Sequence, residues 1–436
     1  MKKLLAIILS CFLLLLAACG NTDTPTNSPS ESDDSVNDTA TPEGEEVTIQ
    51  FAQWWEPELP DGYFKGLMEQ FEEENPGIKV ELISNGYAGT RDILVTGAAT
   101  DTMPDVFGVD GVWIYDWAAS GDFADLNALA ENSGFDTSVI ASATYYEDSM
   151  TTVNIANFVY PLFINWDIFD ELGITEAPQT LQELVDTAIY VAENSDYAGF
   201  ILPLQAENYG CAGNDIVSFV NASGDTVYGE DSMPNVENNS TLKAVFEAFK
   251  QMYDADALAS GSMSMVDQDK VEEFANGRVA MMIGTLAWVN TIKSSSPDMN
   301  LVISGQPVLE SYTGTHGMMY ASWGIGIAAN SPNQEAAWKL VEFLMREDIN
   351  AGLCNNANAL PGNKNAQPDF VSTDVCFEQA YEIFQESELK SDFSGMKGAE
   401  ACQGIMLEEL QYYLLGDISI DECLSNIQAG WEEQWA

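Results

Sequence analysis

An acid and a tryptophan follow a short apolar run in the first third of the chain. Residues 106–109 (VFGV) have the character of a strand buried on both faces, and Asp110 stands where this strand should end. In open α/β sheets, small molecules bind in the crevice beyond the carboxyl ends of the strands. Asp110 and Trp113, with Tyr115 as a further candidate, could therefore face a ligand. Asp110 could equally cap a helix that starts at Gly111, and the sequence leaves both roles open.

A second group of candidate ligand contacts follows the alternating segment at residues 47–52. Trp54, Trp55 and Glu56 come directly after this predicted strand. Two adjacent Trp side chains at a strand end cannot both point into one core, so one of them should reach a surface or a cleft. Aromatic faces and carboxylates at strand ends together predict a small-molecule binding site.

No catalytic or metal-binding motif is visible. The 69 Asp and Glu residues are too many to single out a catalytic pair, and the G-x-S-x-G, H-E-x-x-H and phosphate-loop patterns do not occur. The single histidine, His316, precedes Gly317 and is predicted to be a polar loop residue. The segment at residues 267–269 (DQD) lacks the Gly and Glu of a calcium loop, and we expect a solvated helix start there. The sequence thus predicts a protein that is not an enzyme and that uses no metal and no cofactor.

Length and charge narrow the possible partners. The chain has 436 residues, enough for two domains at about 150 residues each. Its formal net charge is -54, from 15 Lys and Arg against 69 Asp and Glu. Such a surface repels polyanions, so we expect no nucleic acid partner. Neutral or cationic ligands are favoured over anionic ones.

The N-terminus has the form of a secretory signal. Lys2 and Lys3 precede an apolar run at residues 4–16, which is too short to span a bilayer comfortably. The run ends in LAAC at residues 16–19, which resembles a bacterial lipoprotein signal, with an ordinary signal peptide as the alternative. The resemblance implies a signal peptide at residues 1–18, lipidation of Cys19 and a lipid anchor in the cell membrane. Residues 19–46 are polar and acidic, and we expect a disordered tether.

Five cysteines remain after the signal peptide and Cys19. Their number is odd, so at least one is a free thiol, and no spacing matches a CxxC pair. One or two disulfides and buried free thiols both stay open. These five residues are Cys211, Cys354, Cys376, Cys402 and Cys423.

Strands and helices alternate at the start of the mature chain. Strands are predicted at residues 47–52, 78–83 and 106–109, with helices over 66–74 and 90–99, which together form a βαβαβ unit. Segments here and later resemble family 1 of the extracellular solute-binding proteins, the lipoprotein sugar receptors of ABC importers. They occur in the family's order: NPGIKVEL at 75–82, PDVF at 104–107, YPLFIN at 160–165, PQTLQEL at 178–184, FANGRVAMMIG at 274–284, WGIGIAANSP at 323–332 and LPG at 360–362.

The resemblance implies an α/β fold of the periplasmic binding protein type, with two lobes, a cleft between them and three hinge crossovers. It places the crossovers near residues 154–160, 320–323 and 361–365. Lobe one would consist of residues 47–157 plus 323–362. Lobe two would consist of residues 158–322 plus 363–436.

The resemblance also implies a function. It predicts the extracellular substrate-binding component of an ABC transporter, a monomer that captures a sugar or oligosaccharide in the cleft and delivers it to the permease subunits. The implied ligand contacts are aromatic and acidic residues at strand ends and crossovers: Trp54, Trp55, Glu56, Asp110, Trp113, Trp288, Tyr320 and Trp323. An extracellular carbohydrate-active enzyme such as a glycosidase, or a sensor lipoprotein that presents its ligand to a signalling partner, stays open.

Overall fold

The computed structural model describes residues 46–205, 209–229 and 233–435, and of residues 209–211 only the backbone. The predicted signal peptide, the lipidated Cys19 and nearly all of the acidic tether lie outside these residues. Within the described part, no helix combines the length and the apolar character needed to cross a membrane.

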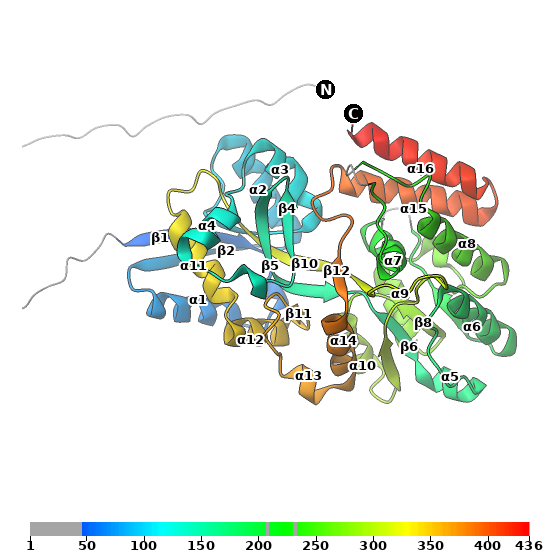
Figure 1. Cartoon of the computed structure of the whole chain (residues 1–436). Helices are drawn as coiled ribbons and strands as arrows, with labels where there is room; N and C mark the ends of the chain where they lie inside the picture. Colours follow the sequence, from blue (N-terminus) through cyan, green and yellow to red (C-terminus); the bar gives the residue numbers. More distant parts are fainter. Residues whose placement is uncertain (1–45, 206–208, 230–232, 436) are drawn as a thin grey trace, which may run out of the picture. The chain divides into compact units, whose positions relative to one another are not determined.

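The strands form two separate sheets (Figure 1). The larger has eight strands in the order β11-β5-β10-β3-β1-β2, with β12 paired to β10 and β4 paired to β5. The smaller has four strands in the order β7-β8-β6-β9. The strand bounds are β1 Val47–Gln53, β2 Ile78–Ser84, β3 Val106–Val109, β4 Ala143–Tyr146, β5 Ser149–Val159, β6 Leu162–Asn165, β7 Ala198–Ile201, β8 Val279–Ile283, β9 Leu301–Ser304, β10 Gly317–Ile327, β11 Leu360–Pro361 and β12 Glu388–Lys390.

Helices cover both sheets. In Figure 1, α1 to α4, α11 and α12 gather around the larger sheet, and the green helices with the red α15 and α16 gather around the smaller one. The helix bounds are α1 Tyr63–Glu74, α2 Tyr87–Thr100, α3 Ile114–Ser120, α4 Leu126–Ser133, α5 Trp166–Leu172, α6 Leu181–Asn194, α7 Tyr209–Ala222, α8 Ser240–Asp254, α9 Asp267–Ala275, α10 Trp288–Ser295, α11 Gln334–Leu344, α12 Glu347–Ala357, α13 Phe370–Thr373, α14 Val375–Glu386, α15 Ala399–Leu415 and α16 Ile420–Trp435.

The predicted βαβαβ unit is confirmed. Strand β1 pairs in parallel with both β2 and β3, and α1 and α2 form the crossovers. The helix expected from Gly111 is in part wrong, because the chain first forms a short 3-10 helix, η2 (Gly111–Trp113), and α3 begins only at Ile114. The apolar strands pack with α1, α4, α11 and α12 in one hydrophobic core, and the smaller sheet has a buried cluster on each face.

The chain passes between the two sheets more than once. It leaves β5 of the larger sheet and enters β6 of the smaller one across Tyr160 and Pro161, and it returns from β9 into β10. After β11 it leaves again, because α14 packs in the cluster that covers β9. Strand β12 then pairs with the first residues of β10 before α15 begins. Several chain segments therefore meet at this junction.

Candidate ligand-binding site

Three aromatic side chains meet beyond the carboxyl ends of β1, β2 and β3. The ring of Trp54 lies 5.4 Å from that of Tyr87 and 5.5 Å from that of Trp113, and the rings of Tyr87 and Trp113 are 4.5 Å apart. Trp54 and Trp113 are buried, whereas Tyr87 is 44% exposed. We call these three residues the aromatic wall. Sequence reasoning missed Tyr87, although the strand-end rule that located Asp110, applied to β2, would have found it.

Two other predicted tryptophans form a stack inside the core. The rings of Trp55 and Trp323 are 5.4 Å apart and only 18° from parallel. Trp55 is 0% exposed and Trp323 is 4% exposed. The stack supports Trp54, whose ring lies 5.6 Å from that of Trp55. A direct ligand contact of Trp55 or Trp323 stays a prediction.

Asp110 follows β3 and caps the short helix η2. Its carboxylate accepts a hydrogen bond of 3.1 Å from the backbone N–H of Val112. Burial raises the pKa of Asp110, the Val112 N–H and the Tyr87 hydroxyl act to lower this pKa, and the negative charge of Glu400 raises it further. Burial and the charge of Asp110 likewise raise the pKa of Tyr87. The capping role is therefore real, and it holds the carboxylate beside the aromatic wall.

Glu56 lies at the neighbouring strand ends. Its carboxylate hydrogen-bonds to the hydroxyl of Ser84, and its backbone N–H donates to the side-chain oxygen of Gln53 at 2.8 Å. The side-chain nitrogen of Gln53 also donates to Ser84 at 2.8 Å. These contacts fix Glu56 between the ends of β1 and β2, the same edge of the sheet as the aromatic wall.

A buried ion cluster lies on the side of the smaller sheet. The Lys270 ammonium is 2.7 Å from Asp215 on α7 and 2.7 Å from Asp267 in the first turn of α9. The Lys270 and Asp215 side chains are 0% and 1% exposed, and that of Asp267 is 16% exposed. We call these three residues the ion triad. The solvated helix start predicted at residues 267–269 is thus wrong for Asp267, which turns inward because Lys270 is buried beside it.

Burial dominates the electrostatics of the ion triad. It raises the pKa of Asp215 to about 7, and the Lys270 charge opposes this change. For Lys270, burial acts to lower the pKa, but Asp215 and Asp267 reverse this and raise it. Two carboxylates thus share one buried ammonium, a costly arrangement unless further hydrogen bonds satisfy it. No spacing in the sequence signals this cluster, because Asp215 and Lys270 are 55 residues apart.

Trp288 lies next to the ion triad. A Cβ atom placed on Gly284 would be 3.4 Å from the Trp288 ring and 3.5 Å from the Lys270 ammonium, so both approach this glycine. The Nε1 atom of Trp288 and the Oδ1 atom of Asp215 are buried without a hydrogen-bond partner among the described residues. Unsatisfied buried polar atoms cost about 1–3 kcal/mol each, so they mark places where a ligand could supply the missing partner.

Helix α15 connects the aromatic wall with the ion triad. Glu400 in its first turn pairs at 3.4 Å with Arg91 of α2, whose guanidinium lies 6.0 Å from the Trp113 ring centre. Three residues later, Gln403 contacts Asn214, the residue before Asp215, at 3.5 Å. Asp110 and Asn214 also line one small cavity together with Tyr320, Ser322 and Ser394. Tyr320 is buried there, which raises its pKa to about 12.

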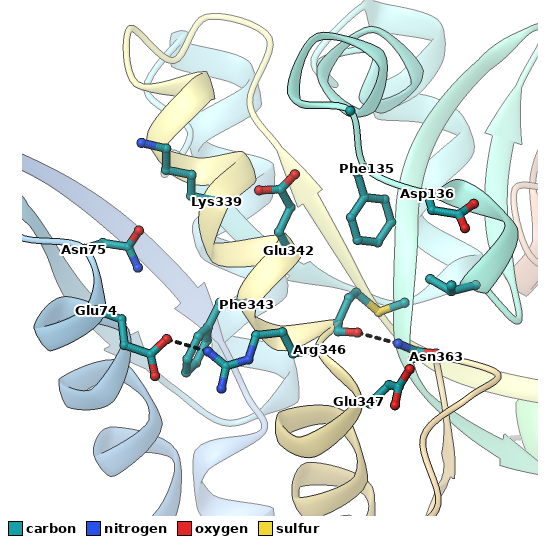
Figure 2. A pocket seen from close by; sticks show the side chains of 13 residues that line it. Glu74, Asn75, Phe135, Asp136, Lys339, Glu342, Phe343, Arg346, Glu347 and Asn363 are labelled. Atoms are coloured by element: carbon teal, nitrogen blue, oxygen red, sulfur yellow. Dashed lines mark hydrogen bonds and ion pairs between the residues drawn. The ribbon is translucent and has the colours of Figure 1, made fainter.

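A larger hollow lies elsewhere. It has a volume of about 670 Å³ and is formed by the ends of α1 and α11 and the start of α12. Figure 2 shows Arg346 reaching toward Glu74 and the Asn363 amide toward the Met345 carbonyl. Arg346 and Glu74 form an ion pair at its rim, and it shares no residue with the aromatic wall, Asp110 or the ion triad. Volume alone therefore does not locate the ligand.

The cysteines whose side chains are described are buried free thiols: Cys354, Cys376, Cys402 and Cys423. Burial raises the pKa of all four, to about 12 for Cys402 and Cys423. The free-thiol alternative is confirmed for these residues, whereas the Cys211 side chain lies outside the described part. No group of three or more His, Cys, Asp or Glu residues in the described part is placed to hold a metal ion.

Two α/β sheets joined by several crossing strands, with aromatic and ionic groups at the junction, define the class of two-lobe binding proteins. The sugar-binding protein MalE of Xanthomonas citri has this fold, with a TM-score of 0.78 and 18% identity over 89% of this chain and 97% of that one. The cyclic α-maltosyl-1,6-maltose binding protein of Arthrobacter globiformis gives a TM-score of 0.76 and 16% identity over 90% and 99%.

The family follows from the sequence. Residues 56–351 match the model of the bacterial extracellular solute-binding protein family, and the chain belongs to this family. A Brucella abortus protein described as a binding protein is 26% identical, over 69% of this chain and 73% of that protein. The diacetylchitobiose binding protein DasA of Streptomyces coelicolor is 23% identical over 87% and 86%. The chain is thus an extracellular solute-binding protein, as its sequence predicted.

Proposed function

We propose that this protein captures a neutral sugar or oligosaccharide at the junction of its two sheets and delivers it to the permease of an ABC transporter. The observation that carries the proposal is the connection, through α15, of the aromatic wall beside Asp110 with the ion triad beside Trp288. Sugar rings have apolar CH faces that pack on aromatic rings and hydroxyls that need polar partners. The ligands named for DasA and for the two structural neighbours, all of them carbohydrates, support the same class.

Each side of the site has a distinct task in this proposal. Tyr87 offers its exposed ring to one face of the sugar, with Trp54 and Trp113 packed against it, and Trp288 lies on the opposite side. Asp110 and the free oxygen of Asp215 accept hydrogen bonds from sugar hydroxyls. Lys270 keeps the Asp215 carboxylate in place. A sugar hydroxyl would thereby satisfy a buried oxygen that has no partner among the described residues.

Closure of the site would follow the crossing strands. We place lobe one at residues 47–157 plus 323–362 and lobe two at residues 158–322 plus 363–436, with the hinge at the crossovers. Rotation about such a hinge closes binding proteins of this class around their ligands. The permease would then recognise the closed form. We further propose lipid anchoring at Cys19 on the outer face of the cell membrane, with the protein acting as a monomer.

Isothermal titration calorimetry across neutral mono- and oligosaccharides tests the sugar assignment. We expect one sugar series to bind, and the Tyr87→Ala variant to bind it about 30-fold more weakly, because the ligand loses an aromatic platform. Tyr190→Ala is the matched control, since Tyr190 on α6 is also 44% exposed and its hydroxyl donates to the Leu172 carbonyl at the end of α5. Heat with a peptide or a polyamine, and none with any sugar, would contradict the proposal.

The same preparation distinguishes binding from catalysis. Sugar recovered from the complex should have unchanged chain length and anomeric form after prolonged incubation. Release of shortened sugars, abolished by substitution of one carboxylate, would instead establish the glycosidase alternative.

A further inference from the structure

A further cavity lies beside the chain segment that joins β12 to α15. Its volume is about 480 Å³, within the range of small-molecule sites. The β4–β5 hairpin and α3 form one wall, and residues near Tyr228 and the end of α16 form the other. We call it the tyrosine pocket after its aromatic lining, which consists of Tyr115, Tyr145, Tyr146, Tyr228 and Trp435. None of these residues belongs to the aromatic wall or the ion triad.

Each wall of the tyrosine pocket carries its own aromatic pair. Tyr115 and Tyr146 are in edge contact with ring centres 5.6 Å apart, and Tyr228 and Trp435 face each other at 6.3 Å. Tyr145 at the hairpin is 54% exposed. Large aromatic rings that surround a hollow, rather than fill a core, leave apolar surface in water, and such surface is typical of binding sites.

A chain segment between β12 and α15 separates the two sites. The backbone N–H of Gly395 donates to the carbonyl of Gly111 at 2.9 Å, and the hydroxyls of Ser394 and Thr144 are 2.9 Å apart. A Cβ atom on Gly111 would lie 2.6 Å from the Ser394 hydroxyl, so the two segments touch. Ser394 lines the tyrosine pocket as well as the small cavity that contains Asp110. A ligand in the tyrosine pocket therefore occupies a site of its own.

The polar groups of the pocket select the class of ligand. The carboxylate of Asp392 is already used by the Asn221 amide and the Val227 N–H, both at 2.9 Å, and the Tyr228 hydroxyl donates to the Asp392 carbonyl at 2.8 Å. This leaves one acid, Glu147, and one base, Lys397, among the charged lining residues. These two charges cancel, and no buried carboxylate is free for a cation.

We propose that the tyrosine pocket is a second carbohydrate site, distinct from the one beside the aromatic wall. Flat rings on both walls suit the CH faces of a pyranose, and the hydroxyls of Tyr115, Tyr145 and Tyr146 suit its hydroxyl rim. Because its walls belong to two different hydrophobic cores, an occupant would contact both halves of the molecule at once. One of these cores surrounds the larger sheet, and the other contains α15 and α16.

The test uses the full chain labelled with 3-fluorotyrosine, in which each pocket resonance is assigned by a Tyr→Phe substitution. Methyl glucoside and N-acetylglucosamine are added at millimolar concentration, and fluorine spectra are recorded for the wild type and for Tyr87→Ala. We expect the resonances of Tyr115, Tyr145 and Tyr146 to shift with at least one sugar in both proteins. The resonance of Tyr412, which is 42% exposed on α15, is the control and should not move.

The Trp435→Ala variant provides the second part of the fluorine NMR test. This residue lies in the last turn of α16, and its loss should weaken the sugar-dependent shifts about tenfold while the other resonances stay unchanged. The proposal is overturned if neither sugar shifts the pocket resonances, or if Tyr412 shifts equally. It is also overturned if choline produces the shifts and the sugars do not, because the pocket would then be a cation site. Loss of the shifts in Tyr87→Ala would show that only one sugar site exists.

Discussion

The aromatic wall and the ion triad are two halves of one candidate site, and they are built in opposite ways. The aromatic wall comes from the ends of three consecutive strands and is held by apolar packing. The ion triad joins two helices, α7 and α9, through buried charges. Apolar packing tolerates small displacements, whereas a buried ion cluster requires every partner in place. The first half should therefore control affinity, and the second should control both fold and specificity.

The largest effect should come from breaking the ion triad. Lys270→Met leaves Asp215 and Asp267 buried without their cation, and loss of one partner of a buried pair costs about 3–5 kcal/mol of unfolding free energy. Urea denaturation measures the change. Lys65→Met is the control, because Lys65 is 68% exposed and its pair with Glu69 should contribute little. Equal stabilities of the two variants would contradict a structural role for the buried cluster.

A variant of Asp110 tests the half of the site that contains the aromatic wall. Asp110 caps the helix η2 and also lies beside this wall. Asp110→Ala should weaken sugar binding about tenfold and lower unfolding free energy by only about 1 kcal/mol, the usual loss for a cap. Asp125→Ala removes a similar cap, since Asp125 accepts from Asn127 N–H at 3.0 Å at the start of α4. Calorimetric titration and thermal unfolding should show equal stability losses but weaker binding only for Asp110→Ala. The reverse result would leave Asp110 as a cap alone.

The difference between the aromatic wall and the ion triad also explains which site residues could be predicted from the sequence. The alternating and apolar runs gave β1, β2 and β3, and the strand-end rule then located Trp54, Asp110 and Trp113. The separate roles of the adjacent Trp54 and Trp55 were harder to predict, because their positions in the sequence do not show that Trp55 stacks on Trp323 in the core. Asp215 and Lys270 carried no signal, since only the packing of α7 against α9 and β8 brings them together.

The pH dependence of stability should also separate the two halves. The pKa of Asp215 is raised to about 7 in the folded protein, so the folded state binds this proton more tightly than the unfolded state, where the pKa is near its ordinary value of 3.8. Its contribution to stability is therefore present at low pH and falls as pH rises between these values. The free energy of unfolding of the wild type minus that of Asp215→Asn should therefore decrease between about pH 4 and 7. The Asp267→Asn variant should retain this pH-dependent decrease. An identical pH profile for both variants would assign the decrease to other carboxylates.

The smallest effect should come from the exposed ion pair that spans the two halves. Arg91 and Glu400 are 46% and 41% exposed at 3.4 Å, so water and salt weaken their attraction. Each single alanine variant should weaken sugar binding about twofold, and the double variant should show no further loss, because the pair acts as one unit. The effect should vanish at high salt.

Lys243 and Asp421 form a comparable exposed pair between α8 and α16, and alanine variants there should leave affinity unchanged. Additive losses from Arg91→Ala and Glu400→Ala would instead mean that Arg91 acts through its position over Trp113, and that the aromatic wall alone governs this edge of the site.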